Sequence, residues 1–177
     1  ISILLLTKFM FEKTKKVIIM ALIMGTIVAS LNYISDNQIA GTGQKETLMM
    51  LEGKSYGIEF VVFKYISTLA SFLSTIAGGL FMTSITIGSG IGSEISELFP
   101  HINHQVIVVM AMVAYLSGVI RAPLTSAFLV LEMTNLLNLL VPAIIISFIA
   151  SVISKQISNK PIYEAIASNY LMLTSKH

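Results

Sequence analysis

The chain has 177 residues, of which 55% are hydrophobic and only 11% charged, with a net charge of +2 and no cysteine. Ordinary soluble domains carry about 25% charged residues, so this composition and a mean hydropathy of +0.84 predict an integral membrane protein. The composition excludes disulfide frameworks and thiolate metal sites, and without a basic stripe interleaved with aromatics we expect no nucleic-acid partner.

The amino-terminal part predicts one complete transmembrane helix. Residues 1–6 are apolar but too short for a signal peptide, and we interpret them as the tail of an earlier span. Because residue 1 is isoleucine, we expect the chain to be part of a longer reading frame. After a polar connection, residues 17–31 are almost continuously hydrophobic, which predicts a membrane-spanning helix that extends to about Ser35.

The next part combines a polar break with two further apolar stretches. Residues 36–57 contain the break, and within them residues 47–51 are too short to span a bilayer, so we expect a re-entrant helical turn there. Residues 58–76 predict a second span and residues 80–95 another apolar segment. The glycine pair Gly78-Gly79 separates the two.

Two charged side chains fall inside the second predicted span. Glu59 and Lys64 are five residues apart, and ionisable groups within a membrane are costly and often functional. We interpret them as snorkelling toward the interface or pairing with each other, rather than as a proton route.

A polar loop precedes the last group of helices. It contains His101 and His104 beside Glu97, which weakly resembles a metal cluster, but no further acid or cysteine lies at ligand spacing. We therefore expect a solvated loop and no metal site. The remaining predicted helices occupy residues 105–120, 123–134 and 136–153, and a last one begins at Pro161.

Short, interrupted helices distinguish this chain from a bundle of simple anchors. Several predicted segments fall short of a comfortable crossing of the ~30 Å hydrocarbon core, and such pieces are tolerated only where protein buries them or where they line a cavity. The pattern therefore favours a transporter or channel. Lysines cluster before the first complete span and at the carboxyl end, so both regions are predicted to be cytoplasmic. No nucleophile elbow, P-loop or dinucleotide fingerprint occurs, and we expect no enzyme activity.

Gly78-Gly-Leu-Phe81 is the first candidate site. A helix that begins near Leu80 leaves its first amide hydrogens without partners in the helix and directs the positive end of its dipole outward. Such an end suits an anion in a low-dielectric setting. Paired glycines also kink membrane helices or let two helices touch, and from this motif alone that structural interpretation is favoured.

Gly88-Ser-Gly-Ile-Gly92 is interpreted as a packing surface rather than an ion site. Gly88 and Gly92 are four residues apart and share one face of a helix. Small residues at this spacing let two membrane helices approach closely.

The carboxyl-terminal part holds three further polar side chains in apolar sequence. We expect Arg121 to pair with a neighbouring carbonyl or acid and Glu132 to cap backbone amides near Asn135, so neither is placed on an ion path. Tyr163 follows Pro161 by two residues, and its hydroxyl can donate a hydrogen bond to an anion. Tyrosine near a helix end is more usually an interfacial anchor.

Four motifs together resemble a known family. Arg121-Ala-Pro-Leu-Thr125, Leu129-Val-Leu-Glu-Met-Thr134 and Lys160-Pro-Ile-Tyr163, taken with Gly78-Gly-Leu-Phe81, are similar to the second half of CLC chloride channels and chloride/proton exchangers. The resemblance implies an all-α, polytopic membrane protein with short, broken and re-entrant helices. It also implies that residues 1–177 form the carboxyl-terminal half of a CLC-type transmembrane domain, without a soluble domain.

The resemblance further implies an anion site. CLC proteins carry a Gly-x-Phe-x-Pro segment whose two backbone amides after the glycine bind chloride, and Gly79, Leu80 and Phe81 match its first three positions. Thr83 stands where the family has proline. Tyr163 matches the tyrosine that coordinates the central chloride. The anion-binding residues implied are Gly79, Leu80, Phe81 and Tyr163.

The same resemblance implies partners. Family members form dimers in which each subunit has its own pore, so we expect a homodimer through residues 123–153, with Ala127, Ala143 and Ala150 suited to close packing. The other partners are the lipid bilayer, the amino-terminal half of the same fold, and chloride or a similar anion as the transported ion, with no cofactor. We expect a multi-pass protein of the bacterial inner membrane.

Alternatives remain at the level of sequence. The family's gating glutamate and serine filter belong to the other half of the fold. Without them, the sequence does not distinguish a channel from a proton-coupled exchanger, and it does not identify the anion. The main rival is a non-transporting assembly subunit or a partial transporter remnant, which Thr83 at the proline position and the expected partial reading frame support. An unrelated cation transporter would need intramembrane acids, for which Glu59 and Glu132 are the candidates.

Overall fold

The computed structural model describes residues 14–73 and 79–157, and within these ranges the chain forms seven α-helices, one short 3-10 helix and no strand. The elements in chain order are α2 (Thr14–Ile34), α3 (Gln44–Leu51), α4 (Gly57–Leu73), α5 (Leu80–Leu98), α6 (His104–Ile120), α7 (Pro123–Thr134), the 3-10 helix η1 (Leu137–Leu139) and α8 (Leu140–Ile157). The prediction of an all-α fold with short helices is confirmed.

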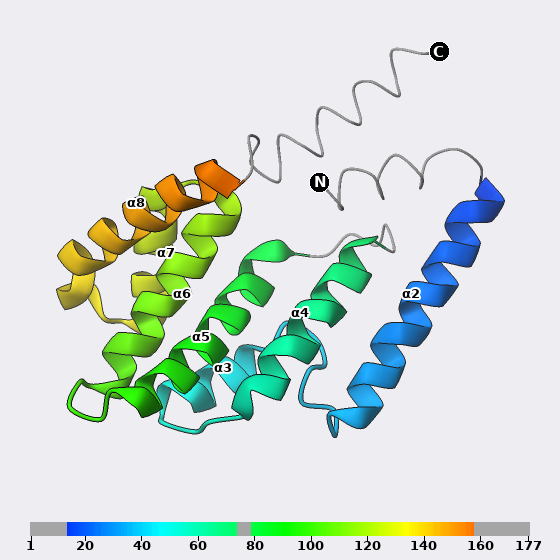
Figure 1. Ribbon diagram of the computed structural model, residues 1–177, viewed down its shortest axis with the longest axis horizontal. Helices are drawn as coiled ribbons and strands as arrows, with labels where there is room; N and C mark the ends of the chain where they lie inside the picture. The colour runs from blue at the N-terminus through cyan, green and yellow to red at the C-terminus, as the bar shows by residue number, and fades with distance from the viewer. Residues whose placement is uncertain (1–13, 74–78, 158–177) are drawn as a thin grey trace, which may run out of the picture.

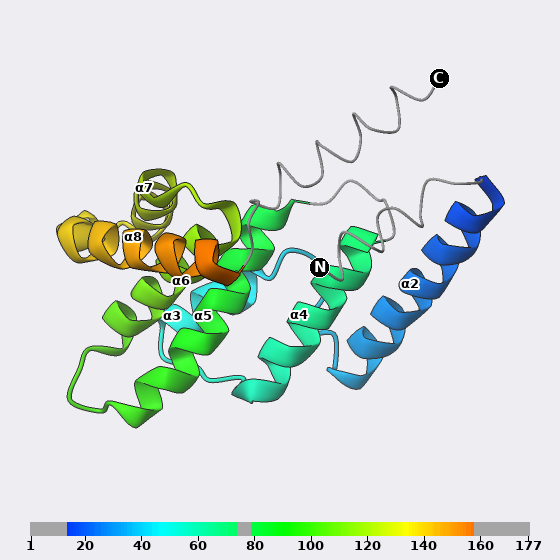
Figure 2. The same ribbon diagram turned by 45° about the horizontal axis from the view of Figure 1, so that its top comes forward.

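Four helices lie in one row. Figure 1 shows α2, α4, α5 and α6 side by side in chain order, with α7 and α8 packed beyond α6. The turned view in Figure 2 keeps the same order. Successive helices of the row run in opposite directions, so the connections 35–43, 52–56 and 99–103 meet at one end of the molecule. The short helix α3 lies near that end, in contact with α5 and α6.

Local sequence sets the ends of α6 and α7. The Asn103 side chain accepts a hydrogen bond from the Gln105 backbone N–H at 2.9 Å and so caps the start of α6. Proline is well accommodated at the first helical position, and α7 begins at Pro123. It ends where Asn135 adopts a left-handed conformation with φ of 56°. The predicted bounds 123–134 match this helix.

Within the described residues, the other predicted segments are helical, with shifted ends. The segment predicted to start at residue 17 is α2, which starts at Thr14, and the helical turn predicted at 47–51 is the eight-residue helix α3. The segment predicted from residue 136 begins as the 3-10 turn η1 before α8 continues it to Ile157. The helix predicted from Pro161 lies outside the described residues.

A glycine fixes α3 against α5. Gly43 precedes α3 with φ of 81°, and a Cβ added to it would lie 2.5 Å from the Thr86 Cγ2. Both the backbone conformation and the close approach therefore require glycine. Beside it, the Thr47 and Thr86 hydroxyl oxygens lie 2.9 Å apart, and Thr86 donates to the Thr42 carbonyl at 3.0 Å. These contacts hold the connection that precedes α3 against the middle of the row.

The glycines of α5 are packing residues, as their spacing predicted. A Cβ added to Gly88 would stand 2.8 Å from the Met112 Cα, and one added to Gly92 would stand 2.7 Å from the Val108 Cα. Both added atoms would collide with α6 backbone. The two helices therefore pack backbone to backbone along this face, which leaves no room for an ion there.

The buried core lies toward α6. Its main cluster joins α5, α6, α7 and α8 and contains the fully buried side chains of Leu116 and Val130. Large apolar residues are in contrast more than half exposed on the outer surfaces of α2 and α8, among them Leu22 and Val152. An apolar surface of this extent suits contact with lipid.

By length and composition, one of the described helical segments, Leu137–Ile157, is long and apolar enough to cross a membrane. Shorter apolar helices lie at Ile18–Ile34, His104–Ile120 and Pro123–Thr134. Short helices beside a full-length span agree with the expectation of broken segments supported by neighbouring protein.

The prediction of a solvated histidine loop is correct for one histidine and wrong for the other. His101 is exposed. The His104 ring lies between the Ser96 hydroxyl, 2.7 Å from Nδ1, and the Met50 carbonyl, 2.6 Å from Nε2. His104 therefore joins α3, α5 and α6. Within the described part of the chain, no group of three metal-ligating side chains comes together.

Candidate functional site

The amino end of α5 is where the candidate anion residues lie. Gly79 precedes the helix in an extended conformation, and among the described residues no side chain caps this end. A Cβ added to Gly79 would have no described atom within 4 Å, so the space beside its backbone is open. Leu80 begins the helix and Phe81 follows it, with the Phe81 side chain partly exposed.

Thr83 replaces the family proline without breaking the helix. Its hydroxyl donates to the Gly79 carbonyl at 3.3 Å and to the Leu80 carbonyl at 3.2 Å. Threonine commonly bonds back to the preceding turn in this way. The hydroxyl thereby ties the residue before the helix to its first turn, a constraint that differs from the fixed φ of proline.

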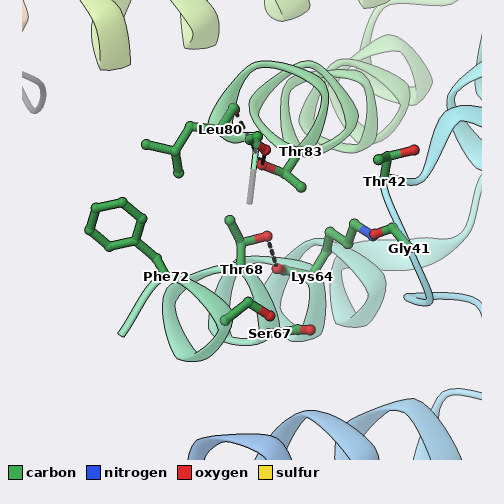
Figure 3. A pocket seen from close by; sticks show the side chains of 10 residues that line it. Gly41, Thr42, Lys64, Ser67, Thr68, Phe72, Leu80 and Thr83 are labelled. Carbon is green, nitrogen blue, oxygen red and sulfur yellow. Dashed lines mark hydrogen bonds between the residues drawn. The ribbon is translucent and has the colours of Figure 1, made fainter. Parts of the chain in front are cut away.

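A cavity of about 240 Å³ adjoins this helix end. Figure 3 shows it between α4 and α5, with the connection that contains Gly41 along one side. The lining residues are Gly41, Thr42, Lys64, Ser67, Thr68, Ser71, Phe72, Gly79, Leu80 and Thr83. Five of these ten carry a hydroxyl, one carries an ammonium, and none is acidic.

Lys64 is the feature of this cavity that our sequence interpretation got wrong. Its side chain is 1% exposed, and Nζ donates to the Ile39 carbonyl at 2.8 Å and to the Gly41 carbonyl at 2.9 Å. Glu59 is exposed. Lys64 therefore neither snorkels nor pairs with Glu59, because the carbonyls of the 35–43 connection come within its reach.

The sequence did contain a signal for this cavity. Lys64, Ser67, Thr68 and Ser71 follow one another at spacings of three, one and three residues, which places them on one face of a helix. A polar face with a lysine inside an apolar run predicts a surface turned away from lipid.

Arg121 and Glu132 lie away from this cavity. As expected, Arg121 pairs with a carbonyl, that of Ser154, to which Nη2 donates at 2.9 Å, while Nε donates to the Ser154 hydroxyl at 3.2 Å. The expected cap by the Glu132 carboxylate is wrong. Glu132 is exposed, and its backbone carbonyl, rather than its side chain, accepts from the Asn135 N–H at 3.3 Å.

One anion-binding residue implied by the resemblance, Tyr163, and one residue of the glycine motif, Gly78, lie outside the structural description. Gly79, Leu80 and Phe81, in contrast, stand together at the start of α5. The contribution of Tyr163 to the same site therefore stays a prediction.

The family model described as voltage-gated chloride channel matches residues 1–155. The chain belongs to this family, the CLC family. It is accordingly an integral membrane protein of a family of transporters and channels for chloride. The match spans every described helix but the last two residues of α8, and it ends before Tyr163.

Proposed function

We propose that this CLC-family chain forms the carboxyl-terminal half of a transmembrane pathway for chloride or a similar small anion, in a channel or a proton-coupled exchanger. The observation that carries the proposal is the amino end of α5, which opens beside Gly79 onto a cavity with a buried lysine and no acidic lining residue. The helix dipole and the ammonium both favour negative charge there.

In this proposal the Gly79-Leu80-Phe81 segment binds the anion through backbone amides. Amide binding depends on helix geometry rather than on side-chain identity, and the α5 helix continues through Thr83. Thr83 in place of proline is thus compatible with an anion at this end. Tyr163 completes the site by donating its hydroxyl to the same anion.

A cation pathway is less well supported by the same geometry. Glu59 and Glu132, the acids considered for such a path, are both exposed. An acid that guides a cation faces a cavity inside the protein, whereas the cavity at α5 is lined by a cation. A remnant without transport function remains the second proposal, which Thr83 at the proline position supports.

For the proposed homodimer through residues 123–153, the structure changes which residues can make the contact. Ala127 and Ala143 are fully buried within the subunit. They pack against neighbouring helices of the same subunit, so the expectation that they lie in the dimer contact is wrong. The outward apolar residues include Leu124 and Phe128 of α7 and Ile145 of α8. We propose that this surface covers its counterpart in a second copy, in a bacterial inner membrane.

Anomalous scattering from bromide-soaked crystals of the full-length protein tests the anion site. We expect a peak within hydrogen-bond distance of the Leu80 or Phe81 backbone nitrogen, because bromide replaces chloride in amide-lined sites. The companion measurement is anion flux against cation flux in liposomes, with bromide and chloride faster than potassium. Absence of anion density at saturating bromide, together with absent anion flux, would favour the remnant.

A further inference from the structure

Lys64 presents more positive charge to its cavity than its partners neutralise. Its two acceptors are the neutral carbonyls of Ile39 and Gly41, and an ammonium has three donors. Within the described residues no carboxylate lies within ion-pair distance of it. One N–H and most of the charge thus remain for a further partner.

Ser67 provides a second donor on the same wall. Ser67 is 7% exposed and lines the cavity one turn beyond Lys64. Its hydroxyl has no hydrogen-bond partner among the described residues. The hydroxyl lies at the cavity surface, where it can donate its proton to a molecule inside the cavity. Water or an anion can accept it.

Thr68 and Thr83 differ from Ser67 because their hydroxyl protons are already engaged. Thr68 donates to the Lys64 backbone carbonyl at 2.8 Å, and Thr83 donates to the carbonyls at the start of α5. Figure 3 shows Lys64 extending from α4 toward Gly41, with Thr68 and Thr83 on the two facing helices. Lys64 and Ser67 are the two buried side chains of this lining, and each has a donor left for a ligand.

Polar groups also line the neighbouring space between α2 and α4. A second cavity of about 440 Å³, between α2 and α4, shares Gly41, Ser67 and Ser71 with the first. It is also lined by Asn32, whose Oδ1 is buried and has no hydrogen-bond partner in the described structure. A buried acceptor of this kind marks a position for water, which places a hydration site in the cavity that shares Ser67.

We propose that the cavity between α4 and α5 is a second anion subsite, in which Lys64 Nζ and the Ser67 hydroxyl hold a small monovalent anion of the chloride class. The subsite rests on the proposed anion path, whose site at Leu80 and Phe81 borders the same cavity. The positive charge of the Lys64 ammonium attracts an anion to this subsite. From there the anion can move to the amino end of α5 without crossing a long apolar surface.

Bromide-soaked crystals of the full-length protein locate the ion. The expected result is one anomalous peak near Lys64 Nζ and Ser67 Oγ and another at the Leu80 and Phe81 amides. A peak at the amides alone overturns this inference and leaves the proposed function standing, with water as the occupant of the cavity. No peak at either place overturns both.

Two matched variants test how the ion is held. Ser67→Ala removes the donor, and we expect it to weaken bromide binding at the Lys64 position about tenfold, since a hydrogen bond to a charged partner is lost. Thr68→Val is the control, because the Thr68 hydroxyl already donates its proton to the Lys64 backbone carbonyl. We expect this variant to retain the bromide peak near Lys64. Lys64→Gln should abolish the peak, and Ser67→Ala keeps the test decisive if Lys64→Gln fails to fold. A Lys64 peak that Ser67→Ala leaves at full occupancy overturns the assignment.

Discussion

Gly92 of α5 and Val108 of α6 lie so close that a Cβ added to the glycine would stand 2.7 Å from the Val108 Cα. The contact is between backbones, so no rotamer change on α6 can make room for a larger residue. Because α5 also begins at the candidate anion site, the helix that carries the site is held in place by this contact and by the equivalent one at Gly88.

We expect Gly92→Ala to destabilise the fold. The methyl group must displace α6, and overpacking of this kind costs about 1–3 kcal/mol. Thermal unfolding of the detergent-solubilised protein should show a clear drop in Tm. The matched control is Gly118→Ala in α6, where an added Cβ meets nothing described within 4 Å; higher helix propensity should there leave stability equal or slightly raised. Equal Tm values for both variants would contradict the close packing.

The two histidines of the polar connection should respond differently to substitution. His104→Ala removes the ring's hydrogen bonds with the Ser96 hydroxyl and the Met50 carbonyl. At about 0.5–1.5 kcal/mol for each lost hydrogen bond, we expect a loss of about 1–3 kcal/mol. His101→Ala removes an exposed side chain and should change the free energy of unfolding by less than about 0.5 kcal/mol. Denaturant titration of both variants measures the difference, and similar midpoints would place His104 in solvent after all.

Removal of the Tyr163 hydroxyl should weaken anion binding. A hydrogen bond to a charged partner contributes about 1.5–3 kcal/mol, so Tyr163→Phe should lower chloride affinity roughly tenfold or somewhat more. Isothermal titration of the full-length protein measures this change. Tyr170→Phe, seven residues further along, is the control and should matter less. Unchanged affinity in Tyr163→Phe would assign the hydroxyl to the membrane interface.

The outward face of α7 and α8 should control association. Leu124 and Ile145 are 51% and 56% exposed in the single subunit, so replacing both with tryptophan disturbs a contact between subunits without touching the core. Light scattering in detergent should show a shift from dimer to monomer. The corresponding change at Ile19 of α2, which is 57% exposed, should leave the mass unchanged. A dimer that persists in the double variant would put the interface elsewhere.

Sequence by itself determined which segments are helical and that they belong in a membrane. Continuous apolar runs define α2 and α8, and Pro123 and Asn135 bound α7 through conformations that their own covalent structure favours. The glycines at positions 88 and 92 also predicted a close helix contact, because their spacing alone places them on one face. These are local properties, in which the relevant groups lie within a few residues of each other.

Only the tertiary structure decided the partners of the polar and small side chains. Lys64 donates to carbonyls 25 and 23 residues earlier in the chain, and the His104 ring contacts one 54 residues earlier. Ala127 faces inward because α6 and α8 pack on that side of α7. A helical repeat shows that a residue lies on a given face, but the element that covers that face is fixed by how the whole chain packs. The surroundings of the anion site, a cavity with a buried lysine, therefore emerged only when α4, α5 and the 35–43 connection were brought together.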